Sequence, residues 1–313
     1  MKAITLKQPG GVEELVQIEI EQPKPADHEV LIQVKAISIN PVDTKTRKGK
    51  GAYGRIKTED PIIIGWDISG IVVSAGKNVT QFKPGDAVFG MVNFPGHGKA
   101  YAEYIVAPET HLTLKPDTIS FEDAAASTLA ALTAWQAMVH HAKVQPGQKV
   151  LIHAAAGGVG HFAVQIAKHL GAYVVGTSSA KNKDFVLNLG ADEHIDYQGY
   201  DWHNSPLSFD FVLDAIGGDN IDISLEVTKP GGTLISIPSG LNEVVTEKSA
   251  AKGVNGYFFM VQSSGEDMAQ IGSMLKKGIL KAHVSETFPF EDIQKAHLHV
   301  ESGRTVGKIV VTI

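Results

Sequence analysis

The stretch LIHAAAGGVG, residues 151–160, decides the fold, because an apolar run changes there into a glycine-rich turn. Beyond the turn, apolar residues recur at the spacing of one helix face, and Gly171 is suited to the C-terminus of that helix. The apolar positions are Val159, Ala163, Ile166 and Leu170. The stretch therefore predicts a strand, a tight turn and a helix in succession.

The chain around this stretch has two textures. Up to about residue 120, short β-rich runs alternate with Pro- and Gly-rich turns, which predicts a small, mainly β barrel or sandwich. From about residue 121, apolar strand candidates alternate with helix candidates, a pattern typical of βαβ units on a parallel sheet. We therefore expect an α/β chain with two domains. The strand candidates of the second part are residues 149–155, 172–177, 194–197, 209–217 and 232–237.

Composition excludes several classes of function. The chain has 313 residues, a net charge of −6 and no block of Lys or Arg, so no nucleic acid partner is expected. The absence of cysteine excludes disulfides, thiolate metal sites and a cysteine nucleophile, and it fits a reducing compartment. The first residues lack the apolar core of a secretory signal. These observations favour a cytoplasmic protein.

Residues 150–167 carry no formal charge over about the length of a membrane span. Three glycines and two histidines interrupt this segment, however, and they indicate a buried turn instead. No membrane partner is therefore expected.

The glycine-rich turn is suited to a dinucleotide. Against the pattern G-x-G-x-x-G it places Ala155, Gly157 and Gly160, with alanine where the first glycine usually stands. Gly157 and Gly158 would let backbone N–H groups approach a pyrophosphate, and Gly160 would let helix and strand pack closely. In the alternative interpretation, the glycines serve only the packing of a tight turn. The predicted cofactor contacts are Ala156, Gly157, Gly158, Val159 and Gly160.

The end of the second strand candidate indicates which dinucleotide binds. NAD sites usually carry an acidic residue about 20 residues after the turn, but this chain has no acid there before Asp184. Instead, Ser178 and Ser179 can donate to a 2′-phosphate, and Lys181 and Lys183 add positive charge. The pattern favours NADP(H). The alternative is an exposed helix start with a serine N-cap and solvated lysines.

An ordered set of motifs covers nearly the whole chain. In order they are INPVD, IIGWDISGIVVSAGKNVTQFKPGDAVFG, YAEYIVAP, AAASTLAALTAWQAM, VQPGQKVLIHAAAGGVGHFAVQIAK, LGADEHIDY and PGGTLISI. The set resembles the zinc-lacking quinone oxidoreductases, the zeta-crystallin-like family of the medium-chain dehydrogenase/reductase superfamily.

The resemblance implies a Rossmann domain, a doubly wound parallel sheet, at residues 121–260. It also implies a β-rich GroES-like domain at residues 1–120, completed by residues 261–313, with the active site in the cleft between the domains. In zinc-dependent relatives a cysteine and a histidine bind the metal, but the matching positions here hold Asn40 and Trp66. No metal is therefore expected, and the 13 histidines of the chain lack the spacing of zinc ligands.

The resemblance also implies roles for single residues. Asn40 and Thr133 match family residues at the nicotinamide ring, and Tyr197 matches a tyrosine beside the adenosine phosphate. Simpler roles stay open, since Asn40 can merely hold the turn before a proline and Tyr197 can be a sheet-end aromatic. Tyr53, in the loop after INPVD, could offer its phenol to an enolate oxygen or serve only in packing.

One position departs from the family pattern. The phosphate-binding lysine of many relatives aligns with Asn182, so either Lys181 or Lys183 has to serve in its place. Arg304 resembles a C-terminal cation that reaches the same phosphate in some relatives, or it is a solvated charge.

Without a metal, a plain ketone lacks an electrophilic helper, whereas a quinone or an enone accepts hydride with less assistance. We therefore expect an NADPH-dependent enzyme that reduces a small quinone or an α,β-unsaturated carbonyl. The alternatives are a non-catalytic NADPH-binding protein with a structural or redox-sensing role, and an enoyl-thioester reductase. A homodimer is expected from the resemblance alone.

Overall fold

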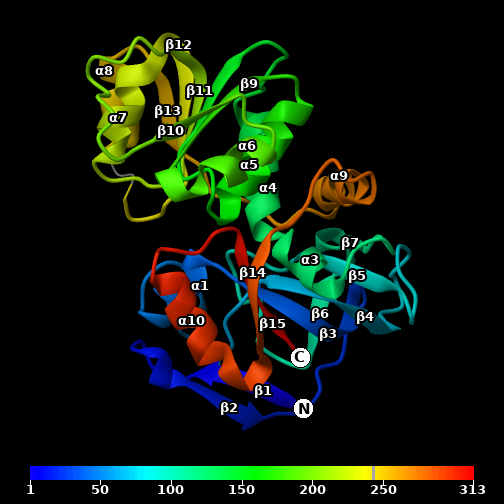
Figure 1. Cartoon of the computed structure of the whole chain (residues 1–313). Helices are drawn as coiled ribbons and strands as arrows, with labels where there is room; N and C mark the ends of the chain where they lie inside the picture. Colours follow the sequence, from blue (N-terminus) through cyan, green and yellow to red (C-terminus); the bar gives the residue numbers. More distant parts are fainter. Residues whose placement is uncertain (242–243) are drawn as a thin grey trace. The chain divides into compact units, whose positions relative to one another are not determined.

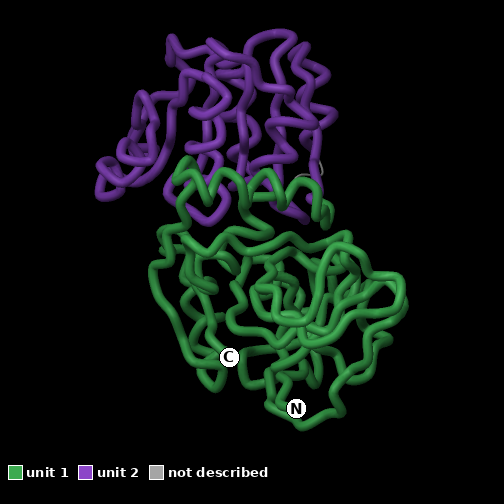
Figure 2. The backbone as a smooth tube through the Cα atoms, turned by 90° about the vertical axis from the view of Figure 1, so that its right-hand side faces the viewer, with its two compact units in different colours: residues 1–132, 262–313 green, residues 133–261 purple. Residues whose placement is uncertain are grey.

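The chain forms two compact units (Figure 2). The computed structural model describes residues 1–241 and 244–313. Unit 1 comprises residues 1–132 and 262–313, and unit 2 comprises residues 133–261. The chain therefore leaves unit 1, forms unit 2 and returns.

Unit 2 is built on a sheet of six parallel strands in the order β10-β9-β8-β11-β12-β13 (Figure 1). Numbered along this unit, the order is 3-2-1-4-5-6, that of a doubly wound Rossmann sheet. This confirms the predicted fold class, and all five strand candidates of this unit are strands. The strands are β8 (Lys149–Ile152), β9 (Tyr173–Ser178), β10 (Glu193–Asp196), β11 (Phe209–Asp214), β12 (Thr228–Ser236) and β13 (Asn255–Phe258).

Helices connect these strands and cover the sheet (Figure 1). The segment that enters the unit is α4 (Leu129–Trp135), which continues as the π-helical turn η3 (Gln136–His141). The core beneath the helices includes Leu151, Val212 and Leu234 from three neighbouring strands. The remaining helical elements are α5 (Gly158–His169), η4 (Ala180–Asn182), α6 (Lys183–Asn188), α7 (Asn220–Val227) and α8 (Val245–Ala251).

Unit 1 is built on a seven-stranded sheet in the order β14-β15-β3-β4-β5-β7, with β6 also paired to β3. A separate hairpin consists of β1 and β2. The first half of β3 pairs with β6 and its last four residues pair with β15. The strands are β1 (Lys2–Leu6), β2 (Leu15–Glu19), β3 (Glu29–Ile39), β4 (Asp67–Ala75), β5 (Ala87–Met91), β6 (Tyr104–Pro108), β7 (Thr113–Leu114), β14 (Val284–Pro289) and β15 (Lys308–Thr312).

The helices of unit 1 come from both ends of the chain. They are α1 (Pro41–Arg47), α2 (Tyr53–Ile56), α3 (Phe121–Ala126), α9 (Gly265–Lys276) and α10 (Ile293–Glu301), with short turns η1 (Val12–Glu14), η2 (Glu109–His111) and η5 (Phe290–Asp292).

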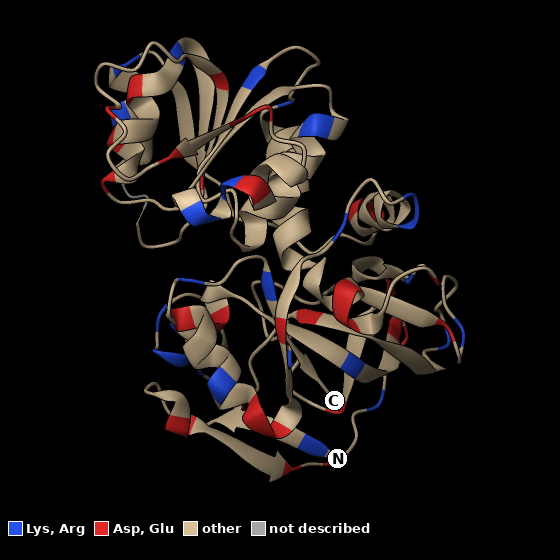
Figure 3. Cartoon of the chain, in the orientation of Figure 1, with Lys and Arg blue, Asp and Glu red and all other residues tan. Residues whose placement is uncertain are grey.

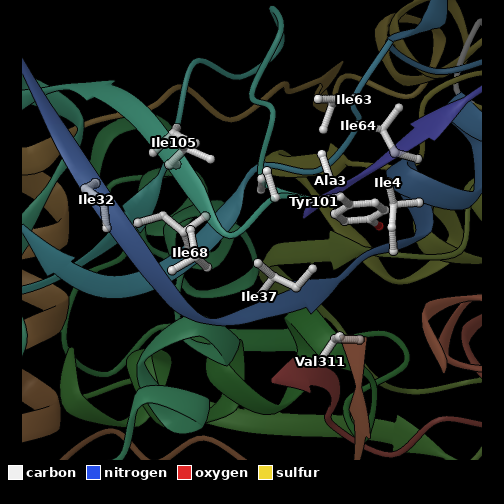
Figure 4. Close-up of a cluster of buried hydrophobic side chains, with 14 of the residues drawn as sticks. Ala3, Ile4, Ile32, Ile37, Ile63, Ile64, Ile68, Tyr101, Ile105 and Val311 are labelled. Carbon is white, nitrogen blue, oxygen red and sulfur yellow. The ribbon is translucent and has the colours of Figure 1, made fainter. Parts of the chain in front are cut away.

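The core of unit 1 joins strands that are distant in sequence (Figure 4). Its buried side chains include Ala3 of β1, Ile37 of β3, Ile68 of β4, Ile105 of β6 and Val311 of β15. Since Val311 belongs to the last strand of the chain, the C-terminal segment is part of this core.

The boundary between the units lies at residues 132 and 133, whereas the change of texture predicts it near residue 120. The difference arises because α3 packs on β3, β4 and β15 of unit 1. There Ala125 and Ala126 are buried against Ala36 and Val310. The helical character of residues 121–132 is visible in the sequence, but the sheet on which they pack is not.

The uncharged segment 150–167 is not a single helix. It contains most of β8, the glycine-rich turn and the greater part of α5. In the described part of the chain, no helix combines the length and the apolarity that crossing a membrane requires.

Candidate functional site

The glycine-rich turn leads from β8 into α5. Ala154 has a left-handed φ of 53°, which is uncommon outside glycine and ends the strand earlier than the sequence predicts. Helix α5 begins at Gly158, and its N-cap residue Gly157 provides no side-chain cap. The first N–H groups of a helix have no partner within it. This start can therefore offer donors and partial positive charge to a phosphate.

Glycine is required where α5 passes closest to the turn. A Cβ atom at Gly160 would lie 2.1 Å from the Ala154 carbonyl oxygen and 2.7 Å from the Ala155 Cα atom. Ala155 itself is fully buried, and a Cβ at Gly176 in β9 would lie 2.9 Å from its methyl group. The alanine in the first glycine position is thus accommodated because Gly176 leaves room for it.

Ser178 and Ser179 lie at the carboxyl end of β9. Ser178 is buried, and its Oγ lies 2.8 Å from His194 Nε2 and donates to the Ser179 carbonyl at 3.1 Å. Ser179 is half-buried and is the N-cap of η4. The structure therefore places Ser179 nearer the surface. His194 was not a candidate, because no local pattern indicates its pairing with residue 178.

Lys181 and Lys183 follow within five residues of Ser178 and are both exposed. Within residues 1–241 and 244–313, no ion pair is formed by either lysine. Burial, and in smaller part the charge of Lys183, lowers the pKa of His194. Since His194 contacts Ser178, the charge of Lys183 acts close to that serine.

Two further predicted residues belong to unit 2. Tyr197 follows β10, its ring is about half exposed, and its backbone N–H donates to the Ser178 carbonyl at 3.4 Å. Thr133 lies on α4 and is buried. The structure thus brings Tyr197 next to Ser178 at the carboxyl edge of the sheet.

Sequence reasoning missed a buried acid and a buried histidine at the same edge. His153 follows β8, and Asp214 is the last residue of the adjacent β11. Burial lowers the pKa of His153 to about 4, against the opposing charge of Asp214. Asp214 accepts from the N–H groups of Ile216 at 2.8 Å and Gly217 at 3.0 Å, so it shapes the turn after β11.

In unit 1, Asn40 directly follows β3 and is the N-cap residue of α1. It is 2% exposed. Its Nδ2 donates to Asp67 Oδ2 at 2.7 Å, its Oδ1 accepts from Lys308 Nζ, and its backbone N–H donates to Asp43 Oδ2 at 2.7 Å. The motifs INPVD, GWD and GKIVV therefore meet at one buried cluster, Asn40, Asp43, Asp67 and Lys308.

Burial raises the pKa of both carboxyl groups of this cluster. Burial, followed by the charge of Asp67, raises the pKa of Asp43 to about 7, and Asp43 Oδ1 has no hydrogen-bond partner. Burial also raises the pKa of Asp67, against the opposing charge of Lys308. The sequence carries one signal for Lys308, a lysine at the head of the apolar run KIVV.

A second chain of polar contacts runs beside the cluster. The Tyr101 hydroxyl lies 2.9 Å from His297 Nε2, and His297 Nδ1 lies 3.3 Å from an Arg47 nitrogen. Arg47, only 1% exposed, donates to Glu301 Oε1 at 2.5 Å. Burial and the neighbouring guanidinium lower the pKa of His297 to about 3. His297 is therefore neutral near pH 7.

Trp66, which the resemblance matches to the zinc-binding histidine of zinc-dependent relatives, packs in the interior of unit 1. Trp66 is fully buried, its Nε1 donates to the Gly96 carbonyl at 2.7 Å, and its ring meets Phe94 edge-on at 5.4 Å. Among the residues that the structure describes, no group of three or more His, Cys, Asp or Glu could hold a metal ion.

The two other candidates of unit 1, Tyr53 and Arg304, have different neighbours from the buried cluster around Asn40. Tyr53 begins α2, and its half-buried ring packs against the apolar core of unit 1. Arg304 is exposed, and its backbone N–H donates to Ser302 Oγ at 3.2 Å.

The fold and the two groups of residues define a dehydrogenase of two domains with a dinucleotide-binding sheet. Residues 26–117 match the alcohol dehydrogenase GroES-like domain family, and residues 189–311 match the family described as zinc-binding dehydrogenase. The NADPH-dependent alkenal/one oxidoreductase of Arabidopsis thaliana is 32% identical over 321 residues, which cover 99% of this chain and 79% of that protein.

Solved structures give the same result. The quinone oxidoreductase from Coxiella burnetii is 35% identical with a TM-score of 0.95, and the match covers 100% of this chain and 99% of that one. The Escherichia coli quinone oxidoreductase complexed with NADPH is 28% identical with a TM-score of 0.87, covering 100% of both chains. The chain belongs to the medium-chain dehydrogenase/reductase superfamily, in its zeta-crystallin-like quinone oxidoreductase family.

Replacing Gly160 by alanine tests the close approach of α5. The added methyl group has to displace backbone atoms, so we expect Gly160→Ala to lower the free energy of unfolding by about 1–3 kcal/mol. Gly157→Ala is the control, because its nearest neighbour lies 3.2 Å away and its φ of −81° suits alanine. Urea unfolding without cofactor measures both, and equal losses for the two variants would contradict the steric account.

The pKa of His297 predicts a pH dependence. Its pKa in the folded chain is below the unfolded value of about 6.5, so its contribution to stability is complete above that pH and is lost as pH falls toward 3. The stability difference between wild type and His297→Gln should therefore shrink by about 1.4 kcal/mol per pH unit from pH 6 downward. Urea unfolding at two pH values measures it. The exposed His169→Gln serves as control, and a constant difference for His297→Gln would argue against a neutral buried ring.

Proposed function

We propose that this protein is an NADPH-dependent oxidoreductase that transfers hydride to a quinone or an α,β-unsaturated carbonyl, without a catalytic metal. The observation that carries the proposal is the carboxyl edge of the parallel sheet in unit 2. There the uncapped start of α5, Ser178 and Tyr197 come together, and two exposed lysines follow Ser178. The related enzymes named for NADPH, alkenals and quinones support the same class of reaction.

The residues of this edge suit the anionic parts of NADPH. The N–H groups at the start of α5, in the segment 156–160, would hold the pyrophosphate. Ser179 and one of the two lysines would hold the 2′-phosphate, since the nearby acids are Asp184 and Asp196, beyond the usual position for a ribose-binding acid. Ser178 is already engaged with His194, so its part is to orient the strand end.

The remaining residues would act on the acceptor and on the nicotinamide ring, which supplies the hydride when bound. In this proposal Asn40 and Thr133 orient the ring, and Tyr53 is a candidate donor to an enolate oxygen. The buried Trp66 occupies the place of a zinc ligand with an aromatic ring, which favours acceptors that need no Lewis acid. A conjugated carbonyl meets that requirement because the hydride adds to carbon while the charge spreads to oxygen.

The proposal extends to assembly and location. β13 pairs with β12 and with no other described strand, so this edge of the sheet is available to a second copy of the chain. We therefore propose a homodimer. We also propose that the protein is cytoplasmic. Acidic and basic residues are interspersed over both units (Figure 3), a distribution that does not favour a nucleic-acid partner. The partner proposed for the site is a small electrophile.

The decisive assay mixes purified protein with NADPH and a panel of quinones and enones, and follows the loss of NADPH absorbance. We expect saturable turnover that a metal chelator leaves unchanged. Gly157→Asp is the negative control, because its carboxylate would repel the pyrophosphate. NADPH binding without turnover of any acceptor would favour the non-catalytic alternative, and inhibition by the chelator would disprove the metal-free reaction.

Single lysine variants test the cofactor preference. Either Lys181→Ala or Lys183→Ala should weaken NADPH binding by roughly tenfold or more, the equivalent of one charge-assisted hydrogen bond. NADH binding should not change, because NADH has no 2′-phosphate. Calorimetric titration of both cofactors measures this, with the exposed Lys277→Ala as a control in unit 1. Equal weakening of NADPH and NADH in both variants would refute the assignment.

A further inference from the structure

Lys308 is a lysine almost without contact with solvent. It begins β15, whose next residue, Ile309, pairs with Ile39, and it is 3% exposed. Its Nζ donates to the Ile39 carbonyl at 3.2 Å and to Asn40 Oδ1, and it lies 3.8 Å from Asp67 Oδ2. Burying an ammonium costs several kcal/mol unless it is paired. These three contacts offset that cost.

The carboxamide of Asn40 can in principle adopt two orientations, which exchange its donor and acceptor ends. Lys308 can only donate, and an ionised Asp67 can only accept. The observed arrangement satisfies both, with Oδ1 toward Lys308 and Nδ2 2.7 Å from Asp67 Oδ2. A flipped amide would set its N–H groups against the ammonium and its oxygen against the carboxylate. The two charges therefore select one orientation of Asn40.

This arrangement leaves the amide with limited capacity for other partners. The second N–H of Nδ2 makes only a 3.4 Å contact with the Ser38 carbonyl. The cation at the oxygen and the anion at the nitrogen polarise the amide in the same sense, which strengthens its N–H donor. Whatever Asn40 presents to a bound partner is thus set by Lys308 and Asp67.

We propose that Lys308 is a positioning residue for the reduction: together with Asp67 it holds the Asn40 amide in the orientation that the reaction uses. The inference rests on the proposed function, in which Asn40 orients the nicotinamide. Lys308 touches neither acceptor nor cofactor in this role. It acts through Asn40, and it also balances the charge of Asp67.

Positioning and charge balance can be separated with three variants. Lys308→Met removes the ammonium but keeps an unbranched side chain, and it leaves Asp67 without a counter-charge. Lys308→Met combined with Asp67→Asn removes both charges and so relieves the burial of a lone carboxylate. Lys308→Arg keeps the charge but changes the geometry of the donor. Lys168→Met is the control, since it breaks the Lys168–Asp192 ion pair of unit 2, 2.8 Å long.

We expect Lys308→Met to lower kcat on the order of 10- to 100-fold, with the Kd of NADPH unchanged within about twofold, because the phosphate contacts lie in unit 2. The double variant should regain thermal stability while its kcat stays low, and Lys308→Arg should recover part of kcat. Lys168→Met should lower stability alone. Recovery of kcat together with stability in the double variant would overturn the proposal, since Lys308 would then only balance charge.

A readout without turnover separates this inference from the proposed function. The side-chain amide resonances of Asn40 can be recorded on ¹⁵N-labelled protein and identified with an Asn40→Ser variant. In Lys308→Met they should shift or broaden, whereas in Lys168→Met they should not. Unchanged Asn40 resonances in Lys308→Met would disprove the positioning role. Failure of the wild type to reduce any acceptor would disprove the proposed function and leave this measurement valid.

Discussion

The burial of one ammonium group is the constraint on which unit 1 depends. Lys308 lies inside the unit, and its partners Asn40 and Asp67 come from two other strand ends. Because a buried charge without partners is costly, β15 has to lie beside β3 and near the start of β4. The last strand of the chain therefore belongs to the first unit, although the second unit lies between them in the sequence. The apolar contact of Val311 with the same core acts in the same direction.

In unit 2 the corresponding constraint is steric. At Gly160 and Gly176 there is no room for a Cβ atom, because α5, the turn and β9 approach one another closely. The strands of this sheet are parallel, so their carboxyl ends lie at the same edge. The ends of the neighbouring strands β8, β9, β10 and β11 therefore lie close together. Polar groups from four separate segments gather there, among them Ser178, Tyr197 and Asp214. A dinucleotide site at this edge follows from the topology of the sheet.

The elements with strong apolar patterns were predictable from the sequence, whereas their ends and partners were not. The candidate strand at 149–155 ends at residue 152, because Ala154 turns the backbone into the left-handed region. β13 was missed, although its last two residues begin the apolar run at residues 257–261; only one of its four residues is buried. The compact units divide at residues 132 and 133, whereas the change of texture lies near residue 120, because helix periodicity does not specify the sheet on which an apolar helix face packs.

The same division applies to the candidate site. The sequence alone determined the strand, turn and helix around residues 151–160, and it indicated the serines and lysines that follow as candidate phosphate contacts. These signals depend only on residues close to one another in the sequence. Only the tertiary structure decided that Ser178 is held by His194, and that Asn40 lies between Lys308 and Asp67. Those contacts join residues 16, 27 and 268 positions apart. Their charges become decisive only after folding has removed water from around them.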